Sequence, residues 1–236
     1  MKISLKTLSL TLVTFGAFLL LSSCNKDEFT PVKPVRPLKP TRLVTALVTY
    51  QDYESGVLMQ LDDSTSLSPS NLEPGLYDNK TVRALVRYFK EKSDVVGDEN
   101  SVKVFAIDTI RTKPASEDMA ELNDSYYGRD KLEIVKDWVT IGEDGYLTLK
   151  VRTHRGNRSA IHSVYLVKKG KEDGKYNFEL RHDADGDVYG RETDGLIAFD
   201  LNELAPADRS PVTLHLTWDG FHGARNADFE LTFRKL

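Results

Sequence analysis

The residues with the clearest potential for chemistry are three alternating aspartates, Asp183, Asp185 and Asp187. Carboxylates at the first, third and fifth places match the opening of a calcium-binding loop, and Asp194 stands at the twelfth place. The glycine that such a loop needs at its sixth place is replaced by Val188, and no flanking helices are predicted. We therefore interpret the segment as a polar hairpin loop and keep calcium as the weaker alternative.

No other set of residues has the spacing of a catalytic or metal-binding motif. The five histidines lack the spacing of metal ligands, and the single cysteine, Cys24, is not near them. The sequence contains no nucleophile elbow, phosphate-binding glycine loop or dinucleotide fingerprint. A carboxylate pair assembled by folding stays open in a chain with 36 acidic residues. We expect no enzyme activity, no cofactor and no metal.

Two aromatic pairs outside the predicted strands are candidates for ligand binding. The first is Tyr126-Tyr127, and the second is Phe221-His222, which is enclosed by two glycines. Aromatic side chains in loops can anchor a glycan or a protein partner. The competing interpretation is that these side chains cover a junction between domains.

The cellular location of the chain is predicted by the segment Leu21-Ser22-Ser23-Cys24, which resembles a lipobox. It ends an uncharged, mostly apolar run over residues 7–21, and Lys2 and Lys6 supply a basic start. This is the pattern of a secretory signal peptide, and the run is shorter than the roughly 20 apolar residues that span a bilayer. We predict cleavage before Cys24 and attachment of acyl chains such as palmitate, which anchor the chain in a membrane.

The residues after Cys24 predict an outer-membrane address and a tether. Lys26-Asp27-Glu28 resembles a signal that sends some lipoproteins to the outer face of the outer membrane, with the periplasmic face as the alternative. Within the tether, residues 24–41, a proline stands at every third position from Pro31 to Pro40. Polyproline geometry makes such a segment a stiff spacer of roughly 30 Å. A docking ligand for an aromatic groove is the weaker alternative.

The composition is that of an acidic globular chain. Removal of the signal peptide, residues 1–23, takes away two of the 32 basic residues and none of the 36 acidic ones, which leaves a net charge of −6. We expect no nucleic-acid partner, because neutralising phosphates requires a basic surface. Hydrophobic residues make up 40% of the sequence, which is enough for a packed core.

Residues 42–117 predict a small β-barrel domain. Four segments have the composition or the alternation of strands: 43–53, 56–62, 80–92 and 101–113. Between the second and third, residues 62–71 hold so many turn-forming residues that we expect a loop. A few short strands must close on themselves to bury enough surface, which favours an OB-like barrel.

Residues 130–236 predict a second, larger β-domain, separated from the first by a linker at residues 118–129. Seven segments have strand character: 132–141, 146–153, 160–168, 176–182, 196–201, 212–218 and 229–233. One apolar face per strand implies two sheets over a shared core, an antiparallel β-sandwich. We expect Trp138 and Trp218 to anchor that core, because a large aromatic side chain buries about 150–250 Å².

Several runs of sequence in the two domains carry a family resemblance. They include Leu61-Asp62-Asp63-Ser64-Thr65-Ser66-Leu67, Ile110-Arg111-Thr112-Lys113, Asp137-Trp138-Val139-Thr140 and Leu196-Ile197-Ala198-Phe199-Asp200-Leu201. Together they are similar to the NigD-like lipoproteins. The resemblance implies an OB-like domain followed by a β-sandwich domain on a lipid tether.

These patterns predict an all-β, two-domain, lipid-anchored envelope protein without catalytic activity. The leading hypothesis is that it presents a recognition surface for a glycan or for another envelope protein. The alternative, which the family name implies, is an immunity or accessory protein that acts on a bacteriocin by sequestration.

Overall fold

The computed structural model describes residues 43–54, 56–78, 80–91 and 100–235, which belong to one compact unit of the chain. The signal peptide, Cys24 and the tether lie outside these residues, so the lipid anchor stays a prediction. Among the described residues, no helix is both long enough and apolar enough to cross a bilayer.

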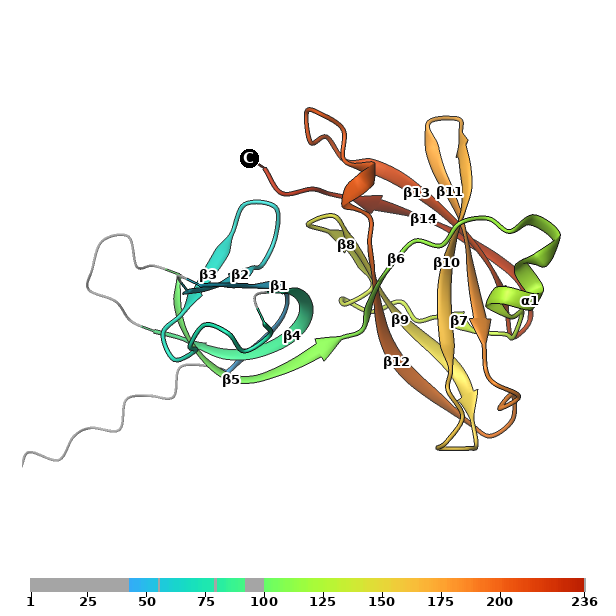
Figure 1. The fold of residues 1–236 in the computed structure, drawn as a ribbon, viewed down its shortest axis with the longest axis horizontal. Helices are drawn as coiled ribbons and strands as arrows, with labels where there is room; N and C mark the ends of the chain where they lie inside the picture. The colour runs from blue at the N-terminus through green and yellow to red at the C-terminus, as the bar shows by residue number, and fades with distance from the viewer. Residues whose placement is uncertain (1–42, 55, 79, 92–99, 236) are drawn as a thin grey trace, which may run out of the picture. The chain divides into compact units, whose positions relative to one another are not determined.

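The first domain is a closed barrel of five strands (Figure 1). The strands are β1 (Val44–Tyr53), β2 (Gly56–Gln60), β3 (Ser66–Pro69), β4 (Thr81–Lys90) and β5 (Ser101–Ile110). Their order around the barrel is β1-β2-β3-β5-β4, and only β3 and β5 run parallel. The predicted first hairpin is confirmed, because β1 and β2 pair antiparallel from Thr49 to Tyr53. The predicted small barrel is confirmed as well.

One barrel strand lies where the sequence predicted a loop. The loop expected over residues 62–71 contains β3, so the expectation is wrong for these four residues. Leu67 of β3 is buried in the barrel core. Just after β3, the side chain of Asn71 donates to the carbonyl of Val104 and accepts from its N–H, at 2.9 and 2.8 Å. These contacts with β5 outweigh the local preference for a turn.

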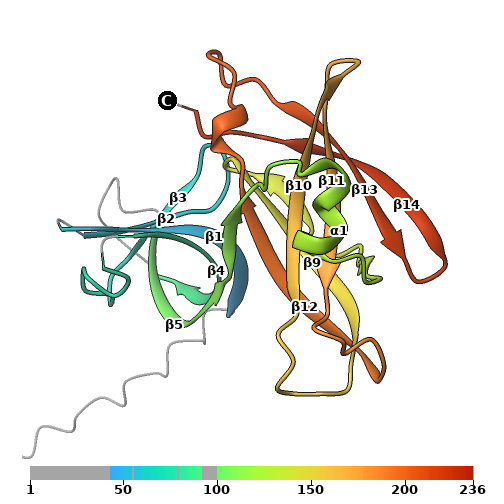
Figure 2. The ribbon, with the colours of Figure 1, turned by 45° about the vertical axis from the view of Figure 1, so that its right-hand side comes forward.

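The second domain is one sheet wound nearly closed around a shared core (Figures 1 and 2). Its strands are β6 (Thr112–Pro114), β7 (Glu133–Ile134), β8 (Ile141–Glu143), β9 (Tyr146–Arg155), β10 (Ser163–Glu172), β11 (Lys175–Asp183), β12 (Arg191–Asp200), β13 (Val212–Gly220) and β14 (Gly223–Leu231). The order is β10-β11-β13-β14-β8-β9-β12-β6, and β7 pairs with β9. Ser116, after β6, bridges to Val167 of β10 and so brings the two ends of the sheet together.

The all-β class predicted from the sequence is confirmed, but the pairing is not purely antiparallel. Three neighbouring pairs in the second domain run parallel, namely β11 with β13, β12 with β6, and β14 with β8. The strands of each pair are separated in the chain by other elements, so strand directions could not be deduced from hairpin turns. Alternation indicates which residues are buried in a strand, not which strand lies beside it.

The sandwich domain begins earlier in the chain than the boundary predicted at residue 117. Strand β6 pairs with β12 through Thr112 and Ala198. The segment 118–129, expected as a linker, holds η1 (Ala120–Leu122) and α1 (Asn123–Tyr127), and a second short turn, η2 (Asn202–Leu204), follows β12. Asn123 is buried, and Asp124 binds Arg181 of β11 at 2.6 Å, so the segment packs on the sandwich.

The two tryptophans differ from each other in burial. Trp218 on β13 is 9% exposed and belongs to the core, which confirms the prediction for this residue. Trp138 is 57% exposed, so its predicted role as a core anchor is wrong. The expected strand over residues 132–141 is broken into β7 and β8, with a turn between them. In that turn Val139, 4% exposed, takes the buried place that the sequence analysis gave to Trp138.

A buried arginine links a strand of the barrel to a strand of the sandwich. Arg83 on β4 is fully buried, and its guanidinium donates to Thr49 Oγ1 and to Glu143 Oε1, both at 2.8 Å. Burial raises the pKa of Glu143, although the charge of Arg83 acts in the opposite direction. A charge buried this deeply requires its partner, since removing one member of such a pair is strongly destabilising.

Candidate functional site

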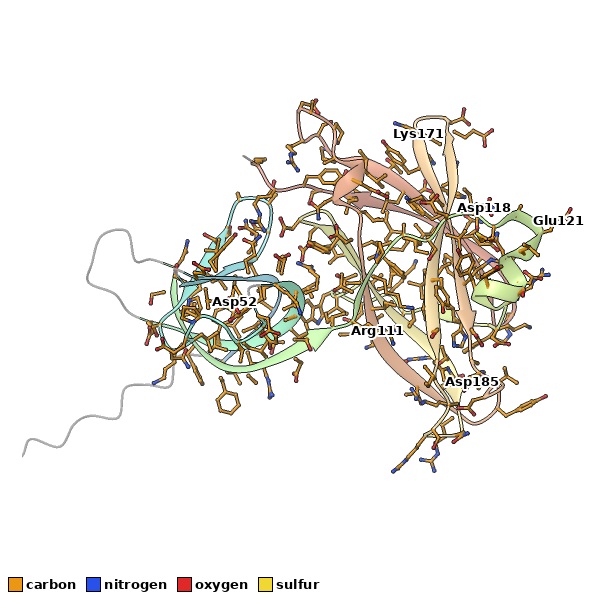
Figure 3. The ribbon with its side chains drawn as sticks, viewed as in Figure 1. Asp52, Arg111, Asp118, Glu121, Lys171 and Asp185 are labelled. Carbon is orange, nitrogen blue, oxygen red and sulfur yellow. The ribbon has the colours of Figure 1, made fainter. Side chains whose placement is uncertain are left out.

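A pocket of about 410 Å³ lies in the sandwich domain, where several connections between strands meet. It is lined by the end of β9, the end of β11 with the β11–β12 loop, the β13–β14 turn, and the segment 129–131. Figure 3 labels Asp185 in the β11–β12 loop. We call this the loop-end pocket. Its lining residues are Arg129, Asp130, Lys131, His154, His182, Ala184, Asp187, Val188 and Phe221.

Asp187 fastens the β11–β12 loop to the β9–β10 loop. Its side chain is 7% exposed, and its carboxylate accepts hydrogen bonds from the backbone N–H groups of Gly156 and Asn157 at 3.0–3.1 Å. A Cβ at Gly156 would lie 2.8 Å from a neighbouring carbonyl oxygen, so this close approach requires glycine. Burial opposes ionisation of Asp187, but the N–H donors and His162 hold the pKa of its carboxyl below the usual value.

Two histidines continue from Asp187 as a buried hydrogen-bonded chain. His162 Nε2 lies 3.2 Å from Asp187 Oδ2, and His162 Nδ1 lies 3.0 Å from His182 Nε2. His182 Nδ1 in turn lies 3.3 Å from the carbonyl oxygen of Lys131. The chain therefore joins the β11–β12 loop, the start of β10, β11 and the segment 129–131. We call His162, His182 and Asp187 the histidine chain.

The acceptor groups at the two ends of the histidine chain determine how many ring protons its hydrogen bonds require. Asp187 and the carbonyl of Lys131 only accept hydrogen bonds, so the outer nitrogen of each imidazole must carry a proton. The hydrogen bond between His162 Nδ1 and His182 Nε2 requires a third ring proton. Three ring protons on two imidazoles amount to one positive charge, and a fourth would place two N–H groups against each other. Burial first, and then the charge of His162, lower the pKa of His182.

The wall of the loop-end pocket mixes charged groups with one aromatic side chain. The ring of Phe221 lies 4.5 Å from that of His154, measured between centroids, and Lys131 Nζ lies 3.4 Å from the carbonyl oxygen of Phe221. Arg129 is held by Asp219, with Nε to Oδ2 at 3.0 Å. No serine, threonine or cysteine is among the described residues that line the pocket. The pocket can therefore bind a polar ligand and exchange a proton, but its lining supplies no hydroxyl or thiol nucleophile.

The structure places the three predicted calcium candidates at the end of β11 and in the loop that follows it. Asp183 Oδ1 accepts the N–H of Asp185 at 2.9 Å, and Asp185 Oδ2 lies 3.4 Å from the N–H of Ile161. Asp187 is occupied by the loop and by His162, as described above. Among the described residues, no group of three or more histidine, aspartate, glutamate or cysteine side chains is arranged to hold a metal ion.

The structure separates the two aromatic pairs singled out in the sequence. Phe221 lines the loop-end pocket, whereas His222 in the same turn is exposed and does not. Tyr126 and Tyr127 lie on α1 and do not line this pocket. Tyr126 is 58% exposed, while the Tyr127 hydroxyl donates to the carbonyl of Glu117 at 2.9 Å. Ligand binding by these four residues stays a prediction, and Phe221 is the one that the fold places in a pocket.

The histidines of this site have no motif spacing, so sequence patterns did not identify them as site residues. A usable signal was the turn sequence Glu172-Asp173-Gly174 between two predicted strands. A hairpin closed by that turn pairs Ser163 with Asp183, as the structure shows, and so places His162 and His182 near each other. Their link to Asp187 depends on the packing of two loops, which no local pattern encodes.

A closed five-stranded barrel followed by a nearly closed sandwich defines a class of two-domain, all-β proteins. The sequence model of the NigD-like N-terminal OB domain matches residues 45–110, and that of the NigD-like C-terminal beta sandwich domain matches residues 114–231. The chain belongs to the NigD-like family. The resemblance seen in the sequence is confirmed, and the second match includes the segment that we expected to be a linker.

Several solved structures share this fold. A provisionally described toxin related protein from Parabacteroides distasonis is 24% identical, with 81% of this chain and 94% of that chain covered and a TM-score of 0.65. A NigD-like immunity protein from Bacteroides caccae is 18% identical, with 81% and 98% covered and a TM-score of 0.59. A provisionally described lipoprotein from Bacteroides fragilis is 12% identical, with 82% and 99% covered and a TM-score of 0.58. No curated protein matches the chain.

Proposed function

We propose that this NigD-like chain is a non-catalytic binding protein of the cell envelope, and that the loop-end pocket binds a glycan. The observation that carries the proposal is a preformed pocket of about 410 Å³ whose wall is fixed by the buried histidine chain. Ligand sites are concave and largely preformed, and a few polar groups set their specificity. The volume lies in the lower part of the range of such sites, about 300–1,000 Å³.

The chemistry of the wall suits a sugar better than an apolar ligand. Arg129, Lys131 and His154 offer hydrogen-bond donors, and Asp130 offers a carboxylate that already accepts the N–H of Ala184 at 2.8 Å. A sugar ring presents hydroxyl groups at its edge, which these groups can satisfy, and a C–H face, which can pack on the ring of Phe221. The lining has no hydroxyl or thiol nucleophile, and its two carboxylates, Asp130 and Asp187, already accept backbone N–H groups, which favours binding without turnover.

The proposal is tested by probing an array of bacterial-envelope and dietary polysaccharide fragments with the full-length chain purified in detergent. We expect binding to at least one glycan, with an affinity reduced at least tenfold by Phe221→Ala. Tyr126→Ala is the matched control, since Tyr126 is an exposed aromatic residue outside the pocket. Absence of binding to any glycan, or equal binding by the Phe221→Ala variant, would overturn the proposal.

The attachment proposed for the chain is a lipid on Cys24, with the folded domains on the outer face of the outer membrane. The support is the lipobox-like sequence together with the provisional description of the B. fragilis neighbour as a lipoprotein. Protease treatment of intact cells is the test. Digestion of the chain on intact cells supports the outer face, whereas digestion only after the outer membrane is broken places the chain on the periplasmic face.

A second candidate function is immunity to a bacteriocin by sequestration. The specific observation in its favour is that the B. caccae neighbour is named an immunity protein. Cells with and without the gene can be challenged with culture supernatants of related strains. Protection that survives Phe221→Ala would favour immunity through another surface, and equal killing of both cell types would count against this function.

A further inference from the structure

Strand β14 has a second edge that is almost unpaired. On one side β14 pairs antiparallel with β13 along its whole length, from Leu231 with Val212 to Gly223 with Gly220. On the other side it meets β8 at a single residue, where Leu231 pairs with Gly142. An unpaired strand edge presents a row of backbone donors and acceptors that can template another strand.

The backbone groups at this edge can be assigned to particular residues. Thr232 donates its N–H to the carbonyl of Gly142, so the even-numbered residues direct their N–H and C=O groups toward the β8 side. Along β14 these are Ala224, Asn226, Asp228 and Glu230. Among the described residues, no backbone hydrogen bond reaches the outer groups of Asn226 or Asp228.

A groove of about 490 Å³ lies beside this edge and opens onto the sandwich core. Its walls come from β7, from the turn between β7 and β8, and from β14. Four of its lining residues, Ile134, Trp218, Ala227 and Phe229, are also part of the core cluster or packed against it. We call this the β14 groove. It shares no lining residue with the loop-end pocket, so the two sites can be tested separately.

Trp218 supplies a second observation that points to a missing partner. Its side chain lines the β14 groove, the residue is 9% exposed, and its Nε1 is buried without a hydrogen-bond acceptor. Buried polar groups in folded proteins are nearly always hydrogen-bonded, so each exception requires an explanation. A ligand that carries acceptors along the groove would provide one.

The charges of the β14 groove favour an acidic ligand. Asp137 is paired with Lys150 at 2.7 Å, and Asp228 with Lys175 at 2.6 Å. No described acidic residue pairs with Lys136 or Arg225, which also line the groove. The remaining acid, Glu133, is held by the N–H of Phe221 at 2.8 Å. An incoming carboxylate would therefore meet two cations that lack a counter-charge.

We propose that the β14 groove binds an extended polypeptide segment with acidic side chains, which adds to β14 as a further strand. Its backbone would pair with the free N–H and C=O groups of Asn226 and Asp228, and its inward side chains would cover Ile134, Ala227 and Phe229. Strand addition obtains affinity from main-chain hydrogen bonds and specificity from alternate side chains. Only a polypeptide offers alternating donors and acceptors at this spacing.

The test is selection of peptides from a phage-displayed random library, of about ten residues each, on the full-length chain in detergent. We expect enriched peptides that contain Asp or Glu. Their affinity should fall at least tenfold for Asn226→Pro, which removes an outward N–H, and at least threefold for Arg225→Glu. The matched control Asn226→Ala keeps the N–H and should bind as the original chain does.

Asn226→Pro should leave the sandwich folded, because proline is tolerated where a strand N–H faces solvent. If that variant does not fold, the same peptides methylated on alternate backbone nitrogens supply the test from the ligand side and should lose binding. The proposal would be overturned if the selection enriched no peptide. It would also be overturned if the enriched peptides bound equally well to Asn226→Pro, or bound equally well after backbone methylation. Phe221→Ala, which damages the loop-end pocket, should leave peptide binding unchanged.

Discussion

Replacing His182 with glutamine should flatten the fall in stability of the sandwich domain below pH 6.5. In the folded chain, burial and the charge of His162 lower the pKa of His182, and Asp130 and Asp183 only partly oppose this. The unfolded chain therefore binds more protons than the folded one as the pH falls below 6.5, the ordinary value for histidine. Stability that is present above this pH is lost as the pH falls toward the lowered pKa.

The size of the effect follows from the proton count of the histidine chain. With the three hydrogen bonds of the histidine chain formed, the folded pair carries three ring protons, whereas the same two side chains carry four when unfolded in acid. A difference of one proton changes the free energy of unfolding by about 1.4 kcal/mol per pH unit. We therefore expect a loss of roughly 1 kcal/mol between pH 6.5 and 5.5 in the original chain. Glutamine at position 182 can still hydrogen-bond but cannot titrate.

The assay is urea unfolding followed by tryptophan fluorescence between pH 5 and 7.5, on the mature chain with Cys24→Ser. Both tryptophans lie in the sandwich domain, so their fluorescence reports its unfolding. His222→Gln is the matched control, since His222 is exposed and outside the histidine chain, and its profile should keep the original slope. Parallel profiles for the original chain and His182→Gln over pH 6.5 to 5 would refute the reasoning.

Four further predictions concern stability and attachment. Trp218→Ala should lower the free energy of unfolding by about 3–5 kcal/mol, whereas Trp138→Ala should change it by about 0.5 kcal/mol or less. Urea unfolding of the two variants measures both changes. Gly190→Ala should lower the free energy of unfolding by about 1–3 kcal/mol, because φ at Gly190 is +125° and the new Cβ would lie 2.5 Å from the carbonyl oxygen of Arg155. Gly174→Ala is the control: its new Cβ would lie in open space, so the same assay should show a smaller decrease. Glu143→Ala should lower the free energy of unfolding by about 3 kcal/mol, because Arg83 would stay buried without its carboxylate partner. A decrease of less than a third of that value, measured by urea unfolding, would contradict the pairing. Cys24→Ser should abolish incorporation of labelled palmitate, and continued labelling would rule out this cysteine as the anchor.

The loop-end pocket shows how far local patterns reach. The alternating aspartates were noticeable in the sequence, but the partners of their side chains were not. Asp187 binds backbone N–H groups about 30 residues away and the imidazole of His162. Phe221 was selected for its turn, and the fold placed it against His154. Neighbours of this kind depend on which loops meet, and such contacts have no periodicity in the sequence.

The sequence by itself determined the all-β class and the barrel-then-sandwich order, because alternation at period two and turn chemistry are local properties of the chain. The family followed from the resemblance of particular runs of residues to the NigD-like lipoproteins. The tertiary structure alone decided the parallel pairings, the packing of residues 118–129, and which tryptophan is buried. It also decided that the rings of His162 and His182 lie within hydrogen-bonding distance and that β14 meets β8 at a single residue, which leaves most of that edge unpaired. These features depend on contacts between residues far apart in the chain, where the geometry of packing and burial, rather than local preference, sets the free energy.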